Sequence, residues 1–194
     1  MPGWRVVSER PLYGDEWLDI RIADIELPDG RHLEHRSIRI AAGAGVLVLD
    51  RDQQVLLIWR HRFITGTWGW EIPMGRVEED EPPADAAARE FEEETGWRAG
   101  PLRPLIRVRP TPGISDSEHH VYRADEATRI GEPVDAYESE RVAWVPLADV
   151  RSLIDGGDIV SGSTLVALLY VLGEVVLSIP GGADRRSGDR PDQN

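Results

Sequence analysis

The first forty residues alternate apolar and polar side chains in three stretches. An apolar side chain recurs at nearly every second position in residues 4–9, 17–27 and 32–40. A repeat of two residues is the period of a half-buried strand. The segment Pro-Asp-Gly at residues 28–30 stands between the second and third stretches and is typical of a hairpin turn. The pattern therefore predicts a small antiparallel sheet over residues 1–40.

Apolar residues dominate the next two segments, at residues 44–49 and 54–59. Runs of this density are typical of strands that are buried on both faces. The polar triplet at residues 50–52 separates the two runs, so we expect a second hairpin there. Later strands are predicted at residues 102–109, 118–122 and 141–145.

Helical segments lie among and after these strands, which is the pattern of an α/β fold. One ends at Gly96, and two C-terminal helices are predicted at residues 146–154 and 162–177. We expect an α/β/α sandwich over residues 41–178, with a mixed sheet between the first helix and the C-terminal helices. Residues 179–194 are almost free of apolar side chains, which predicts a disordered tail.

Composition narrows the function classes. The chain has 194 residues and a formal net charge of −13, which argues against an electrostatic nucleic-acid binder. It has no cysteine, which excludes disulfides, a zinc-thiolate site and a cysteine nucleophile and fits a reducing compartment. The N-terminus lacks an apolar signal segment, and the apolar run at residues 165–172 is too short to span a bilayer. We therefore expect a cytoplasmic protein with no membrane and no nucleic-acid partner.

The helix that ends at Gly96 places three carboxylates on one face. A helix turns by about 100° per residue, so Glu90, Glu93 and Glu94 fall within an arc of about 100°. An apolar strip beside them can pack on a sheet and consists of Ala84, Ala88, Phe91 and Thr95. Like charges repel, and a divalent cation with oxygen ligands would reverse the sign of that interaction. A solvated acidic face is the alternative.

Residues 75–97 read GRVEEDEPPADAAAREFEEETGW. This segment resembles the signature of the Nudix hydrolases, G-x5-E-x7-R-E-U-x-E-E-x-G-U, in which U is a bulky apolar residue. All seven invariant letters match, and Phe91 and Trp97 are larger than the usual residues at U. The resemblance covers roughly residues 41–175. It implies the Nudix fold and metal-dependent hydrolysis of a pyrophosphate bond.

The resemblance also implies a ligand set for Mg²⁺, with Mn²⁺ as an alternative. Glu90 and Glu94 are four residues apart and would hold one ion, while Glu93 would bridge to a second ion and take part in catalysis. The backbone carbonyl of Met74 would add another oxygen. Gly75 would let the backbone pass close to the ions, where a Cβ atom would obstruct.

Two further residues of the signature have supporting roles by the same resemblance. Arg89 and Glu81 would form ion pairs that orient the metal ligands. Glu81 could instead only cap the helix, which is predicted to begin near Pro82 with Asp80 or Glu81 as its cap.

A general base must take a proton from the attacking water. In the ADP-ribose pyrophosphatase branch of the family this base is a carboxylate on a loop beyond the signature. Glu138 and Glu140 both lie in the matching region, and Glu140 is favoured because it directly precedes a predicted strand. Each could also be an ordinary surface acid.

Other positions resemble the substrate site of that branch. Arg60 and Arg62 end a buried strand and could hold phosphate, although Arg60 could equally be a solvent-exposed strand end. Glu71 could bind a sugar hydroxyl. Pro112 lies fifteen residues after the signature, close to the marker proline of the ADP-ribose pyrophosphatases, and Glu118 follows this loop as a candidate ligand of metal or ribose.

These features predict hydrolysis of a nucleoside diphosphate sugar, with ADP-ribose as the leading substrate. The products would be a nucleoside monophosphate and a sugar phosphate. GDP-mannose, a dinucleoside polyphosphate and an oxidised nucleoside triphosphate are the alternative substrates. A non-catalytic domain that senses ADP-ribose is the alternative from another class, and the intact signature disfavours it.

The predicted sheet of residues 1–40 also resembles that of the ADP-ribose pyrophosphatase branch, where it exchanges across a homodimer. A sheet of three strands needs a surface to pack against. We expect a homodimer through this sheet, and packing on the protein's own domain is the alternative.

Overall fold

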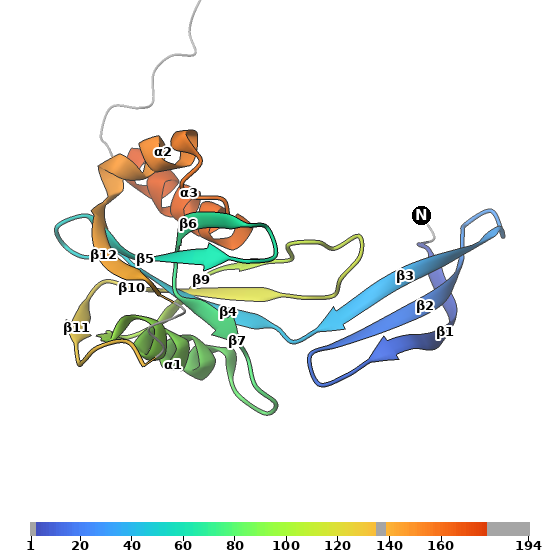
Figure 1. The fold of residues 1–194 in the computed structure, drawn as a ribbon. Coiled ribbons are helices and arrows are strands. Elements are labelled where there is room, and N and C mark those ends of the chain that lie inside the picture. The colour runs from blue at the N-terminus through green and yellow to red at the C-terminus, as the bar shows by residue number, and fades with distance from the viewer. Residues whose placement is uncertain (1–2, 135–138, 178–194) are drawn as a thin grey trace, which may run out of the picture.

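We describe the protein from a computed structural model, which describes residues 3–134 and 139–177. Two layers of helix enclose the strands of the main domain (Figure 1). Helix α1 (Pro83–Thr95) covers one face, and α2 (Leu147–Gly156) and α3 (Gly162–Leu177) cover the other. The α/β/α sandwich that the sequence predicted is therefore confirmed.

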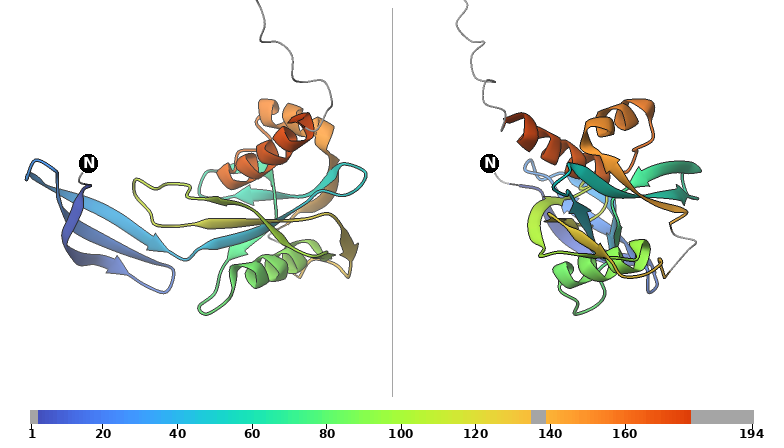
Figure 2. Two further views of the ribbon diagram at one scale, coloured as in Figure 1. Left: turned by 180° about the vertical axis from the view of Figure 1, so that it is seen from behind. Right: turned by 90° about the vertical axis from the view of Figure 1, so that its left-hand side faces the viewer.

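The N-terminal strands form a separate antiparallel sheet, as predicted. Its strands β1 (Arg5–Gly14), β2 (Leu18–Glu26) and β3 (His32–Ile40) pair in the order β1-β2-β3. This sheet projects from one end of the sandwich (Figure 2). Strand β1 is exposed along its whole length in the single chain, whereas β2 contributes three buried residues.

The main domain holds three groups of paired strands, in the orders β7-β4-β10-β9, β12-β5-β6 and β11-β8. Among the described strands of this domain, β4 and β10 are the one parallel pair and the other pairs are antiparallel, so the sheet is mixed. The bounds are Gly43–Val48 for β4, Gln54–Arg62 for β5, Thr67–Glu71 for β6, Met74–Arg76 for β7, Trp97–Ala99 for β8, Arg103–Val108 for β9, His119–Ala124 for β10, Ala127–Arg129 for β11 and Arg141–Pro146 for β12.

The predicted hairpin between β4 and β5 is wrong. The two strands meet in one isolated bridge, between Leu49 and Val55, and otherwise belong to different sheets. Strand β4 pairs with β7 and β10, which are distant in the sequence. Both strands are buried on both faces, and such strands carry no alternation that would identify a neighbour.

Successive side chains of β4 enter two different cores. Val46 and Val48 pack with Phe91 of α1, while Leu47 packs in the other cluster with Leu168 of α3. This alternation follows from the two-residue period of a strand. It explains why the segment is apolar throughout and why helices cover both faces of the sheet.

Helix α1 differs in two details from its predicted form. Its N-cap residue is Pro82, with no side-chain cap bond, so neither Asp80 nor Glu81 caps it. Its fully buried alanines are Ala86 and Ala87, because the apolar strip is centred nearer Glu94 than the sequence suggested. The C-cap is Gly96, whose φ of 70° lies in the left-handed region that glycine adopts without strain.

In the part of the chain that the structure describes, we find no helix with the length and hydropathy needed to cross a membrane.

Candidate active site

The start of the signature segment runs close to β4 because Gly45 has no side chain. A Cβ atom at Gly45 would lie 2.5 Å from the carbonyl oxygen of Pro73 and 2.7 Å from the Cβ of Met74. Strand β7 can therefore pair with β4 only beside a glycine, with Gly45 opposite Met74. This pairing brings Gly75, the middle residue of β7, against helix α1.

Gly75 is in direct contact with the carboxylate of Glu90. A Cβ atom at Gly75 would overlap all three atoms of that carboxylate group. The backbone and the acid can approach this closely only because residue 75 is glycine. Glu90 is thus held at the point where β7 passes the middle of α1.

Arg89 joins three of the predicted carboxylates. Its guanidinium donates to both oxygens of Glu81 at 3.0 Å, to Oε1 of Glu90 at 2.8 Å and to Oε2 of Glu93 at 3.0 Å. The hydrogen bonds from Arg89 and from the Glu78 amide hold the pKa of Glu81 below its ordinary value. The bonds to Glu81, and secondarily those to Glu90, raise the pKa of Arg89. Arg89 is therefore a permanent cation at the centre of an acidic cluster.

Glu94 is bound from two other elements. Its Oε1 lies 2.8 Å from Nη1 of Arg60 on β5, and its Oε2 accepts a 2.9 Å hydrogen bond from the backbone amide of Met74. Arg60 and Glu94 are both buried. The alternative of a solvent-exposed strand end is therefore wrong for Arg60, which instead lies inside the domain against a predicted metal ligand.

The predicted metal ligands are close together but are not assembled as a metal site. Among residues 3–134 and 139–177, no group of three or more histidine, aspartate or glutamate side chains is placed to hold an ion. Arg89 and Arg60 bind the oxygens of Glu90, Glu93 and Glu94 instead. The donor set nevertheless fits Mg²⁺ or Mn²⁺, because carboxylates of one helix face lie against a glycine whose missing side chain leaves the backbone accessible.

Arg62 and Glu71, both predicted to bind substrate, bind each other. Glu71 is buried and accepts hydrogen bonds from Nε of Arg62 at 3.0 Å and from Nη2 at 2.5 Å. Arg62 lies on β5 and is half-exposed, two residues beyond Arg60. The fork-shaped pairing fixes the guanidinium with one face open to the surface.

The loop that contains Pro112 packs on the N-terminal sheet. Ile38 of β3 donates its amide to the carbonyl of Ile114 at 2.8 Å and forms a parallel bridge with Ser115. Pro112 lines a cavity of about 390 Å³ beside this junction. The loop thus joins the N-terminal sheet to the sandwich.

Glu118 faces basic groups at the end of this loop. Its Oε2 lies 3.0 Å from Nε of Arg109, and its Oε1 lies 3.3 Å from both Nη1 of Arg107 and Nε2 of His120. The hydrogen bond from Arg109, followed by the charges around it, lowers the pKa of Glu118. In the structure its carboxylate is therefore paired with basic side chains on and next to β9 and β10, and it is not part of the acidic cluster of α1.

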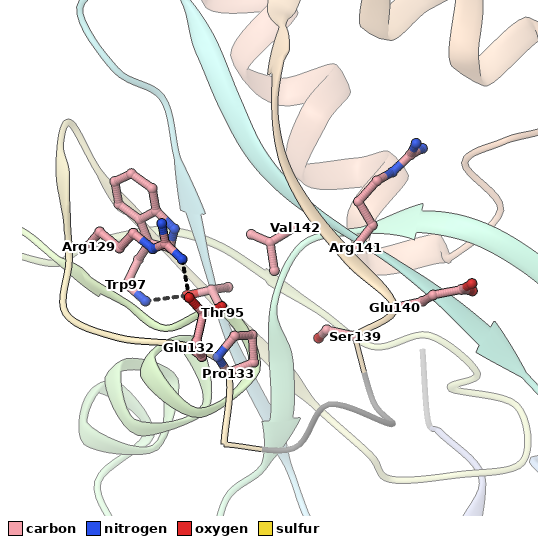
Figure 3. Close-up of a pocket in the computed structure, with 9 residues that line it drawn as sticks. All are labelled: Thr95, Trp97, Arg129, Glu132, Pro133, Ser139, Glu140, Arg141 and Val142. Carbon is pink, nitrogen blue, oxygen red and sulfur yellow. Dashed lines mark hydrogen bonds and ion pairs between the residues drawn. The ribbon is translucent and has the colours of Figure 1, made fainter.

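Of the two candidate bases, Glu138 lies outside the described residues. Glu140 is exposed, and its amide donates to the carbonyl of Trp59 at 3.0 Å, next to Arg60 on the same strand. It borders a cavity of about 480 Å³, and its side chain points away from Thr95 and Trp97 on the far side of that cavity (Figure 3). The backbone of Glu140 therefore pairs with the strand of Arg60, and no contact of its carboxylate within residues 3–134 and 139–177 distinguishes it as a base.

Sequence reasoning missed two polar residues near the site. Ser117 and His119 follow the Pro112 loop and line a groove that also includes Gly43, Met74 and Gly75. Ser117 is buried, and burial, followed by the charge of His120, lowers the pKa of His119. The sequence offers no spacing signal for them, because the parallel pairing of β10 with β4 alone brings them beside Gly75.

Comparison with known families and proteins agrees with this geometry. The family model described as the NUDIX domain matches residues 39–164. A second model, described as the nucleoside diphosphate sugar hydrolase N-terminal domain, matches residues 4–37. The two matches correspond to the sandwich and to the N-terminal sheet.

Curated relatives cover most of the chain. A CMP-5'-(N-acetyl-N-hydroxy-3-aminopropyl)phosphonate hydrolase of Streptomyces rubellomurinus is 41% identical over 88% of this chain and 82% of its own length. An ADP-ribose pyrophosphatase of Bacillus subtilis is 26% identical over 86% of this chain and 91% of its own. An ADP-ribose pyrophosphatase of Mycobacterium tuberculosis is 25% identical over 87% and 83%.

A solved structure shares the fold. The crystal structure of an ADP compounds hydrolase superposes with a TM-score of 0.78 at 19% identity and covers 91% of this chain and 96% of that one. At this identity the similarity establishes the architecture, including the N-terminal sheet, and leaves the substrate open.

Proposed function

The chain belongs to the Nudix family and is a pyrophosphohydrolase, and we propose that it cleaves the phosphoanhydride bond between a nucleoside monophosphate and a second phosphorus-containing group. One observation carries the proposal. Glu90 and Glu94 lie against the backbone of Gly75 and Met74, and Arg89 ties Glu90 to Glu81 and Glu93. These contacts support the roles that the resemblance implies for the signature residues.

The proposed roles of the acidic cluster follow from its contacts. Glu90, Glu93, Glu94 and the Met74 carbonyl would hold Mg²⁺ or Mn²⁺, which when bound neutralises charge on the phosphoryl oxygens and activates water. Glu81 holds Arg89, and Arg89 orients Glu90 and Glu93. Arg60 holds Glu94 from the opposite side. Each of these carboxylates is thus paired with an arginine, and a bound ion would take the place of that arginine.

The hydrolysis itself needs a water, a base and a bound anhydride. Water attacks one phosphorus atom, the bridging P–O bond breaks, and the departing phosphate or phosphonate takes the electron pair. Glu140 or Glu138 would accept the proton of the water, and Arg62 would bind the anhydride. Pro112 and Glu118 would shape the far end of the substrate site, where their loop meets the N-terminal sheet.

ADP-ribose is the proposed substrate. The N-terminal domain match and the two ADP-ribose pyrophosphatases support it. Its hydrolysis would give AMP and ribose 5-phosphate.

A CMP-linked phosphonate is a second candidate. The 41% identity to the hydrolase from Streptomyces rubellomurinus favours it, because that similarity exceeds the similarity to both ADP-ribose enzymes. In this case the same anhydride cleavage would give CMP and a free phosphonate.

A substrate panel tests the proposal. Purified enzyme with Mg²⁺ or Mn²⁺ is offered ADP-ribose, a CMP-linked phosphonate, GDP-mannose and a dinucleoside polyphosphate, and released nucleoside monophosphate is separated and quantified. We expect AMP or CMP from one of the first two at a rate far above the others. Hydrolysis of none of these anhydrides would contradict the proposal.

We further propose that residues 1–40 form a dimer element and residues 41–178 the catalytic domain. The N-terminal sheet leaves large apolar side chains exposed in the single chain, among them Val6 at 55%, Leu12 at 56% and Tyr13 at 55% on β1. Exposed apolar side chains gathered on one sheet are typical of a protein interface. Sedimentation should show a dimer, and Leu12→Asp should convert it to a monomer. A monomeric wild-type protein would contradict this assignment.

A further inference from the structure

A groove runs between the N-terminal sheet and the start of the signature segment. It has a volume of about 340 Å³, which is within the range of small-molecule sites. Trp17 and Ile40 line it on the side of the N-terminal sheet, and Gly75 lies at its other side. Because Gly75 contacts Glu90, the groove opens beside the carboxylates that would act on the anhydride.

Ser117 is a buried hydroxyl in this groove without a hydrogen-bond partner among the described residues. The residue is 5% exposed, and its Oγ atom forms no hydrogen bond within that part of the chain. Its backbone amide is bound to Ser115, so its position is fixed. A buried hydroxyl that lacks a partner is unfavourable, and rotation of the Ser117 side chain toward the groove would let a ligand oxygen satisfy it.

His119 is held in one orientation at the same wall. Its Nδ1 atom lies 2.7 Å from the hydroxyl of Ser163, which is buried at the start of α3. The opposite edge of the ring faces Gly43, where a Cβ atom would lie 3.1 Å from Cδ2 and 3.4 Å from Nε2. The Nε2 edge of the ring therefore faces Gly43, which also lines the groove.

The charged groups of the groove have partners of their own. Arg62 forms its two hydrogen bonds with Glu71, and Arg76 donates to the carbonyl of Glu16 and lies 5.2 Å from the ring centre of Trp17. A second phosphate would have to compete for Arg62 with the carboxylate of Glu71 and with the anhydride itself. A hydroxyl or similar uncharged oxygen group would not compete with Glu71, because it can form hydrogen bonds with the serine hydroxyl and the imidazole edge.

We propose that Ser117 and His119 form a specificity-determining subsite for the uncharged, oxygen-bearing part of the substrate. That part lies on the side of the anhydride away from the nucleotide. The inference rests on the proposed anhydride hydrolysis. In ADP-ribose the subsite would take the hydroxyls of the terminal ribose, and in the CMP-linked phosphonate it would take the N-hydroxy-acetamide group. Ser163 is a positioning residue that acts through His119.

Paired substrates separate this role from the chemistry. For ADP-ribose the truncated partner is ADP methyl ester, and for the phosphonate it is CMP linked to methylphosphonate. Both partners keep the anhydride and lose the uncharged group. Ser117→Ala should lower kcat/KM about tenfold for the full substrate and less than twofold for the truncated one, because one hydrogen bond is lost only in the first case.

Matched variants control for side effects. Ser152→Ala removes an exposed serine hydroxyl on α2, outside the groove and outside the cavity that Pro112 lines, and it should leave both substrates unaffected. Ser163→Ala should raise KM for the full substrate with little change in kcat, and His119→Gln should do the same. Ser117→Ala removes a buried hydroxyl that has no protein partner here, so its melting temperature should match the wild type.

The outcomes are distinct. Selective loss on the full substrate in Ser117→Ala supports the subsite. Equal losses on full and truncated substrates, or no loss, overturn it while the anhydride hydrolysis stands. Hydrolysis of no substrate by the wild-type enzyme overturns the proposed function and the subsite together.

Discussion

Nη1 of Arg60 on β5 lies 2.8 Å from Oε1 of Glu94 on α1, with 7% and 3% of the two side chains exposed. The pair joins the β12-β5-β6 sheet to the helix that packs on the β7-β4-β10-β9 sheet. Glu94 also accepts a hydrogen bond from the amide of Met74, the first residue of β7, directly before the signature. One buried ion pair thus links two sheets and a proposed metal ligand.

Removal of one partner of this pair should destabilise the fold. Arg60→Met leaves the Glu94 carboxylate buried beside an apolar side chain, and breaking a buried pair in this way costs about 3–5 kcal/mol. Urea denaturation should show this loss in the free energy of unfolding. The double variant Arg60→Met/Glu94→Gln should recover most of it, because no buried charge remains. Equal stabilities of the wild type and Arg60→Met would show that the pair is not structural.

Gly75→Ala tests the contact between strand β7 and the acidic face of α1. The added Cβ atom would overlap the Glu90 carboxylate, so Glu90 must move away from Arg89. A displacement of about 1 Å at an active site lowers activity by about 100-fold, and we expect a loss of this size in kcat. Gly173→Ala is the matched control, since a Cβ atom there has no atom within 4 Å. Full activity in Gly75→Ala would contradict the assignment of Glu90 to the site.

The burial of His119 predicts a pH dependence of stability. Burial lowers the pKa of its imidazole below 6.5 in the folded protein, so the unfolded chain binds the proton first as the pH falls. The free energy of unfolding should decrease below pH 6.5, until the folded pKa is passed, with a slope of at most about 1.4 kcal/mol per pH unit. Denaturation between pH 7.5 and 5.5 should show this slope in the wild type and a smaller one in His119→Gln. Identical slopes would contradict the burial effect.

The parts of the fold that follow from local patterns were predictable. The strands of the N-terminal sheet alternate in character, and α1 ends at Gly96 where a left-handed residue is needed. Strands β7, β8 and β11 have three residues each, which is too short for a periodic signal. The partner of β4 could not be predicted, because its parallel neighbour β10 lies about 75 residues further along and both faces of β4 are apolar.

The candidate site divides in the same way. The proximity of Arg89, Glu90 and Glu94 could be predicted from the signature, because residues only a few positions apart on a helix have fixed relative positions. The burial of Arg60 against Glu94 depends on packing between two sheets, so its sequence position at a strand end left both phosphate binding and solvent exposure open. Ser117 and His119 acquire their place only when β10 pairs with β4 beside Gly75.

The central claim is that one face of α1 performs metal-dependent anhydride hydrolysis. Glu93 and Glu92 are neighbours with the same side chain, but Glu93 binds Arg89 in the acidic cluster, whereas Glu92 pairs with Arg98 away from it. The most direct measurement is therefore the Mg²⁺ dependence of kcat in Glu93→Gln and Glu92→Gln, with the substrate that the wild-type enzyme hydrolyses best. We predict that Glu93→Gln loses turnover by at least about 100-fold and that Glu92→Gln keeps the wild-type rate. Equal, near-wild-type rates in two well-folded variants would contradict the account.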